Sequence, residues 1–243
     1  MKTSILLIAL FLPLSMVIGQ GNLNDLEYGA YLTNSKSLWK SAVQKRTAIY
    51  TKSKNMSDLF DLVLAQHGLL GATMGDKDET LFDEYLDSTK DNLDLLIEQN
   101  YQLAESKALL SSIYGFEMGY SSWKGIYLGS KSSGLIDDAL AVDNNSPLVW
   151  QIYASSKLFT PTMFGGDKNE AVKAYEKAIA LYDQQGSSKL NNWRYLDAQA
   201  WLGQAYIVTG KKEKGVAVFE NVLQQEPDFN WVSKVLLPKA QPK

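Results

Sequence analysis

Apolar side chains recur three and four positions apart along most of the chain, which is the spacing of one face of an α-helix. The segment 171–179 shows the pattern clearly, with Ala171, Ala174, Tyr175 and Ala178 on one side. Extended runs of alternating valine, isoleucine and threonine between hairpin turns, which are typical of strands, do not stand out. The pattern therefore predicts an all-α fold. The expected helices cover residues 23–32, 36–51, 57–73, 77–98, 101–117, 131–142, 147–159, 168–184, 192–209 and 212–225.

Several helix ends can be predicted from capping chemistry. Ser146 precedes a proline, which is favoured at the first helical position because the N–H that it lacks would have no partner there. Asp167 is followed three residues later by a glutamate, the spacing of a capping box. Gly210, followed by lysines, is typical of a helix C-terminus. Three glycines interrupt the pattern in 118–130, and neither that segment nor 226–243 is assigned to a helix.

Two segments in the second half share a repeated order of aromatic, apolar and small residues. The segment 196–229 has Leu-Gly-x-x-Tyr from Leu202, then Gly-x-x-x-Phe from Gly215, and a proline near its end. The segment 147–184 has a similar order with a longer connection between its two helices. Both resemble the tetratricopeptide repeat, whose 34 residues carry W-x2-L-G-x2-Y, then A-x3-F, then a proline. The clearest departure is Gln199 in place of the tryptophan.

The resemblance implies a right-handed α-solenoid of about five tetratricopeptide-like helical hairpins, formed by a single domain over residues 20–243. One hairpin cannot bury its apolar face alone, so stacked neighbours bury it, with small residues where helices approach closely. In the family, the concave groove of the stack holds protein or peptide partners. The resemblance therefore implies a partner site on the first helix of each pair. The groove candidates are Leu148, Gln151, Ser155, Asp197, Ala200, Gln204 and Val208.

The N-terminal residues predict export. Lys2 is followed by an apolar stretch from Ile5 to Ile18, and a small residue, Gly19, follows it. This order is typical of a signal peptide over residues 1–19, and an uncleaved anchor is the alternative. The chain contains no cysteine, and for an exported chain of this size that favours a bacterial envelope. The expected location is the periplasm or the medium.

Composition and charge argue against several classes of function. The 24 basic and 27 acidic residues give a net charge of −3, so nucleic acid is not an expected partner. His67 is the only histidine, so no second histidine and no cysteine could complete a metal site with it. We therefore expect no catalytic residue, no metal and no cofactor, and a protein that is not an enzyme.

The connection between residues 159 and 167 is the most distinctive feature of the chain. Its proline and its paired glycines shape a turn, and Asp167 caps the next helix. Its large apolar residues could instead line a ligand pocket or contact a partner. A pocket would favour an alternative function, that of a periplasmic small-molecule-binding accessory protein of a solute transport system. The candidate loop residues are Phe159, Pro161, Met163, Phe164 and Asp167.

Overall fold

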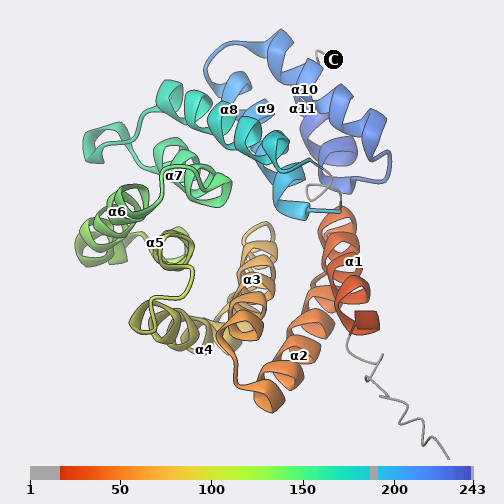
Figure 1. The fold of residues 1–243 in the computed structure, drawn as a ribbon. Helices are drawn as coiled ribbons and strands as arrows, with labels where there is room; N and C mark the ends of the chain where they lie inside the picture. Colours follow the sequence, from red (N-terminus) through yellow and green to blue (C-terminus); the bar gives the residue numbers. More distant parts are fainter. Residues whose placement is uncertain (1–16, 187–190, 242–243) are drawn as a thin grey trace, which may run out of the picture.

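The computed structural model describes residues 17–186 and 191–241, and every regular element within those ranges is helical (Figure 1). Short 3-10 helices lie at Ser122–Lys124 (η1) and Thr162–Phe164 (η2), and a π-helix lies at Val232–Leu236 (η4). The α-helices are α1 (Val17–Thr33), α2 (Lys36–Ser53), α3 (Met56–Thr73), α4 (Glu79–Glu98), α5 (Leu103–Tyr120), α6 (Gly125–Val142), α7 (Pro147–Phe159), α8 (Lys168–Gln184), α9 (Trp193–Val208), α10 (Lys212–Gln225) and α11 (Leu237–Ala240).

Consecutive helices pack as hairpins, and the closest pairs are α5 with α6, α7 with α8, and α9 with α10. Each hairpin also contacts the next, so the predicted α-solenoid is confirmed. The array curves so strongly that α1 returns to pack against α9, and the first and last helices lie side by side (Figure 1). The solenoid is therefore a nearly closed ring and not an open arc.

The predicted helix caps are present. Ser146 Oγ accepts a hydrogen bond from the backbone N–H of Val149 at the start of α7. The Asp167 carboxylate accepts hydrogen bonds from the backbone N–H groups of Asn169 and Glu170 at the start of α8. Gly210 has a φ of +78°, the left-handed conformation that ends many helices.

Helix α6 begins six residues earlier than the sequence predicts, at Gly125 instead of residue 131. Burial of Leu128 in its first turn offsets the low helix propensity of the glycines around it. The Ser132 hydroxyl also donates to the backbone oxygen of Ser111, which fixes α6 against α5. Tertiary packing thus overrides local propensity here.

The segment after α10 is helical, although the sequence pattern assigned no helix there. Val232, Leu236 and Ala240 are buried at four-residue spacing and pack in one cluster with Phe219 of α10. Pro238 interrupts the backbone hydrogen bonding of this segment because it lacks an N–H. The backbone widens into the π-helix η4 just before it. The four-residue spacing was the signal that could have found this segment.

Two glycines lie where helices approach most closely. A Cβ at Gly68 would be 2.4 Å from the Trp39 ring, and a Cβ at Gly203 would be 2.3 Å from the Phe219 ring. Both rings are fully buried. The sequence correctly predicts that small residues set the distance between neighbouring helices.

Candidate functional site

Aromatic side chains close the ring. Tyr31 of α1 lies 5.4 Å from the Trp193 ring of α9 and 5.1 Å from Phe229. Trp39 of α2 lies 5.2 Å from Trp193 in an edge-to-face arrangement. The concave side near α9 is therefore filled by the chain's own N-terminal helices.

This packing covers part of the predicted groove. Leu148, Gln151 and Ala200 are buried, and Ser155 and Gln204 are partly buried. The Ser155 and Tyr175 hydroxyls form a 2.7 Å hydrogen bond to each other. In this ring these five side chains do not form an open surface, and their role in partner binding stays a prediction.

The sixth groove candidate, Asp197, lies at the contact between the two ends of the array. Its carboxylate accepts a 2.7 Å hydrogen bond from the Tyr31 hydroxyl and another of 2.7 Å from Gln151 Nε2. Gln151 in turn accepts from the Tyr182 hydroxyl at 2.9 Å. Burial raises the pKa of Asp197 to about 6, although these two donors and Arg194 act to lower it. Asp197 thus joins α1, α7 and α9.

A second polar group joins the first three helices. The buried Arg46 of α2 donates from Nε to Glu27 at 2.8 Å, from Nη1 to Asp61 at 2.9 Å and from Nη2 to Asn24 at 2.7 Å. Burial raises the pKa of Glu27 and of Asp61, and Arg46 acts to lower both. Such an ion-pair group holds α1, α2 and α3 in a fixed arrangement.

His67 and Ser112 also meet inside the ring, with 2.9 Å between His67 Nε2 and Ser112 Oγ. A catalytic triad requires a carboxylate on the other imidazole nitrogen. Within the described residues, His67 Nδ1 is buried and has no hydrogen-bond partner. Burial, with a contribution from Arg194, lowers the pKa of His67 to about 3. Burial therefore favours the neutral form of the His67 imidazole.

Three further buried donors have no hydrogen-bond partner in the described part of the chain: Trp193 Nε1, Arg194 Nε and Arg194 Nη2. The sequence analysis named neither residue. A tryptophan and an arginine at the start of an ordinary amphipathic helix carry no local signal of burial.

The candidate loop residues lie outside the ring and remain accessible. Phe159 is 61% exposed, Met163 83% and Phe164 71%. An enclosed pocket would bury these side chains, so the loop does not line one. Pro161 and Asp167 shape the loop and cap α8.

The loop has a well-defined backbone. The backbone N–H of Asp167 donates to Lys157 O at 3.0 Å, and Lys157 Nζ donates to Gly165 O at 3.1 Å. A Cβ at Gly166 would be 1.7 Å from Thr160 O, so only glycine fits there. The exposed apolar side chains thus lie on a loop whose backbone is held in place by hydrogen bonds.

Neighbouring aromatic residues extend this exposed region. The Phe159 ring lies 4.9 Å from Trp201 of α9 in an edge-to-face arrangement, and Trp201 lies 4.8 Å from Trp231. Val208, the seventh groove candidate, is 50% exposed and follows Trp201 by two helical turns, so both lie on one side of α9. We define the loop surface as Phe159, Met163, Phe164, Trp201 and Val208.

Asp76 and Asp78, which lie just before α4, form ion pairs. Lys36 Nζ lies 2.6 Å from a carboxylate oxygen of Asp76 and 2.6 Å from one of Asp78. Among the described residues, no group of three or more histidine, cysteine, aspartate or glutamate side chains is arranged to hold a metal ion.

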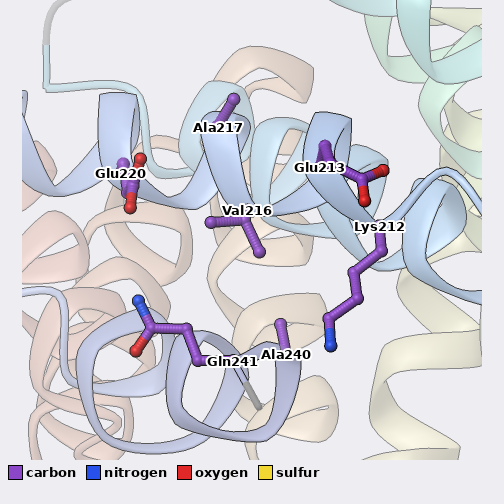
Figure 2. Close-up of a pocket in the computed structure, with 7 residues that line it drawn as sticks. All are labelled: Lys212, Glu213, Val216, Ala217, Glu220, Ala240 and Gln241. Carbon is purple, nitrogen blue, oxygen red and sulfur yellow. The ribbon is translucent and has the colours of Figure 1, made fainter.

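A shallow depression lies between α10 and α11 (Figure 2). Its floor is aliphatic and its rim carries lysine, glutamate and glutamine side chains. It shares no residue with the loop surface. The lining residues are Lys212, Glu213, Val216, Ala217, Glu220, Ala240 and Gln241.

Comparison with known families identifies the repeat. Residues 163–185 and 196–229 match the tetratricopeptide repeat family. These two segments make up less than a quarter of the chain, so the match applies to them and not to the whole chain. The second has the bounds that the sequence predicts, and the first match begins inside the long loop, where extra residues break the usual 34-residue spacing.

A solved structure has a similar fold over most of the chain. A thermophilic tetratricopeptide repeat protein of Thermus thermophilus is similar, with a TM-score of 0.61 at 14% sequence identity, over 91% of this chain and 98% of that one. At that identity the similarity shows the fold alone. No curated protein matches the chain in sequence.

Tetratricopeptide repeats generally mediate protein–protein interactions. None of the described helices is both long enough and apolar enough to cross a membrane.

Proposed function

We propose that this chain is an exported, non-catalytic scaffold protein that binds a protein or peptide partner through the loop surface. The observation that carries the proposal is the exposure of Phe159, Met163 and Phe164 on a loop whose backbone is fixed by hydrogen bonds. Exposed apolar patches commonly mark interaction sites. A fixed backbone also lowers the entropy that binding would cost.

The partner is expected to present aliphatic or aromatic side chains. Two phenylalanines and a methionine can pack against such side chains, and methionine adapts its shape to different partners. The Phe159 ring packs against Trp201, so this aromatic side chain would lose little conformational freedom on binding a partner. Gln151 and Asp197, two of the groove candidates, are hydrogen-bonded to each other in this arrangement.

The test begins with the full chain in bacterial cells and a photo-crosslinking residue in place of Met163. The crosslinked partner is identified by mass spectrometry, purified and titrated with the wild-type chain by calorimetry. The double variant Met163→Ser/Phe164→Ser should bind at least about tenfold more weakly, because two interface side chains that pack on the partner are removed.

Ile126→Ser is the matched control, since Ile126 is 88% exposed on α6 and lies outside the loop surface. Its affinity for the partner should equal that of the wild type. Equal weakening in both variants, or crosslinking at position 126 to the same partner as at 163, would contradict the proposal.

Export is the second part of the proposal and rests on the order of Lys2, the apolar stretch and Gly19. The predicted leader lies largely outside the described residues. Intact-mass and N-terminal analysis of the protein from a bacterial envelope fraction should show a chain that begins at Gln20. A full-length chain in the cytoplasmic fraction would contradict export.

The small-molecule alternative placed the ligand in a pocket lined by the loop. Because the loop's apolar side chains face solvent, the loop favours a protein partner over an enclosed small ligand.

A further inference from the structure

Only two of the 24 basic residues are arginines, Arg46, which is buried, and Arg194, which is partly buried. The Arg46 guanidinium donates hydrogen bonds to Glu27, Asp61 and Asn24. Arg194 is different. It interacts through charge with groups on α1, α2, α3 and α8, but it makes no ion pair of hydrogen-bonding length within the described residues.

The two unpaired nitrogens of Arg194 are Nε and Nη2. These two N–H groups lie on the same edge of the guanidinium and point in parallel. This edge forms the two-bond pair with a carboxylate or a phosphate. A buried donor pair of this kind is costly to leave without acceptors, since it has lost its contacts with water.

The surroundings hold this edge in place. The guanidinium lies over the Trp193 ring, with 4.5 Å between its central carbon and the ring centroid. Trp193 is itself only 7% exposed and is packed between Tyr31 and Trp39. Its own indole Nε1–H is buried and has no acceptor in the described chain. Arg194 as a whole keeps some exposed surface, so the residue is not sealed from solvent.

We infer that Arg194 and Trp193 form a binding site, inside the ring, for a small organic anion that presents two oxygens of a carboxylate or phosphate group. The guanidinium edge of Arg194 donates to both oxygens. The Trp193 ring packs against the guanidinium. Glu27 and Asp61 are engaged with Arg46 and are not available as hydrogen-bond partners for Arg194 in this arrangement.

This inference does not rest on the proposed function, because the loop surface lies on other side chains of the molecule. The site would make the protein a binder of a small anion as well as of a protein partner. Loss of partner binding at the loop surface would leave the anion site untouched, and the reverse also holds.

The presence of only two arginines makes the test direct. In an ¹⁵N-correlated NMR spectrum of the full chain, the side chains give only two arginine Nε–H signals, and Arg194→Lys identifies one of them by its disappearance. Sodium acetate, sodium benzoate and inorganic phosphate are titrated separately, with sodium chloride at equal ionic strength as the control.

The expected result is a saturable shift of the Arg194 Nε–H signal with at least one probe. The Arg46 signal should not shift, because the Arg46 Nε–H already donates to Glu27. A comparison of the shifts with acetate and benzoate to the shift with phosphate distinguishes carboxylate from phosphate ligands. Arg194→Lys keeps the charge but loses the paired edge, so the affinity measured from the Trp193 indole signal should fall at least about tenfold.

No saturable shift with any of the three probes would overturn the inference, and ordered water would then account for the unpaired donors. Equal shifts of both arginine signals, or equal affinity in Arg194→Lys, would also overturn it, since they would indicate general salt effects. The Arg194→Met variant adds a check on folding. The anion-free variant should keep the far-ultraviolet circular dichroism spectrum of the wild type, which separates a loss of anion binding from unfolding. An Arg194→Met variant that binds the probe as tightly as the wild type would overturn the site.

Discussion

The Tyr31 hydroxyl donates a 2.7 Å hydrogen bond to Asp197 although 166 residues separate them in the chain. This bond joins α1 to α9 and so links the two ends of the array of repeats. Another bond from the same helix, from the Tyr28 hydroxyl to Glu226 at 2.6 Å, spans 198 residues. Together with the aromatic contacts of Trp193, these bonds turn a curved array into a ring.

Tyr31→Phe should loosen the ring. The variant keeps the aromatic contacts with Trp193 and Phe229 but leaves the Asp197 carboxylate with one hydrogen bond fewer. We expect the free energy of unfolding in urea to fall by about 1–3 kcal/mol, the cost of removing a donor from a buried charged acceptor. Tyr127→Phe, at an exposed tyrosine of α6, is the control and should change stability by less than about 0.5 kcal/mol. Equal effects of the two substitutions would show that the Tyr31 bond does not stabilise the ring.

Arg46→Met should be more damaging. Arg46 holds two partly or fully buried carboxylates, and its loss leaves both without their counter-charge. The expected cost is about 3–5 kcal/mol in the free energy of unfolding, measured in urea. Lys45→Met is matched in position and chemistry, and Lys45 is exposed, so it should be nearly neutral. Adding Glu27→Gln to Arg46→Met should recover part of the loss, and a failure to recover would argue against unpaired charge as the cause.

Gly203→Ala and Gly134→Ala should act in opposite directions. A methyl group at Gly203 would overlap the buried Phe219 ring, and overpacking of this kind typically costs about 1–3 kcal/mol. Gly134 is exposed within α6 and has open space where a Cβ would stand. Alanine there should stabilise the chain by up to about 1 kcal/mol, because glycine is a poor helix former. Thermal unfolding of both variants checks the signs, and two shifts of the same sign would contradict this account.

His67 should make the protein sensitive to acid. Its pKa is about 3 in the folded protein against an ordinary value of 6.5, so between these values the unfolded chain binds more protons than the folded one. The free energy of unfolding contributed by His67 therefore rises with pH across this window, by up to about 1.4 kcal/mol per pH unit, and is lost as the pH falls. Asp197, whose pKa is raised to about 6, acts with the opposite sign in part of the same window.

A comparison with His67→Gln isolates the histidine, because the Asp197 effect is common to both proteins. Glutamine keeps a polar atom near Ser112 and does not titrate. The stability difference between wild type and variant, measured by urea unfolding at pH 6.5, 5.5 and 4.5, should shift steadily against the wild type as the pH falls. A pH-independent difference would show that the imidazole titrates normally.

Prediction from sequence succeeded where the physics is local. The caps at Ser146 and Asp167, the turn at Gly210 and the close contact at Gly203 depend on residues within a few positions or within one repeat. The helix over 125–130 was missed because its glycines are poor helix formers. Only packing against α5, a tertiary effect, decides in its favour.

The candidate site depends on tertiary packing more than the helices do. The sequence placed partner binding on the first helix of each pair, and it could not show that α1 would cover part of that face. It did single out Phe159, Met163 and Phe164, because large apolar residues in a glycine-rich loop are unusual. It could not decide between a pocket and an exposed surface, since burial depends on what the rest of the chain places over the loop.

The sequence by itself determined most of the helices, the repeated pattern in 196–229 and the turn chemistry of the 159–167 loop, because short-range spacing and capping carry that information. Only the tertiary structure decided that the array closes on itself, that Asp197 joins three helices and that Arg194 keeps an unpaired edge inside the ring. Contacts between residues more than 100 positions apart depend on the small rotation between successive hairpins, summed over the whole stack. No local pattern of residues encodes that sum.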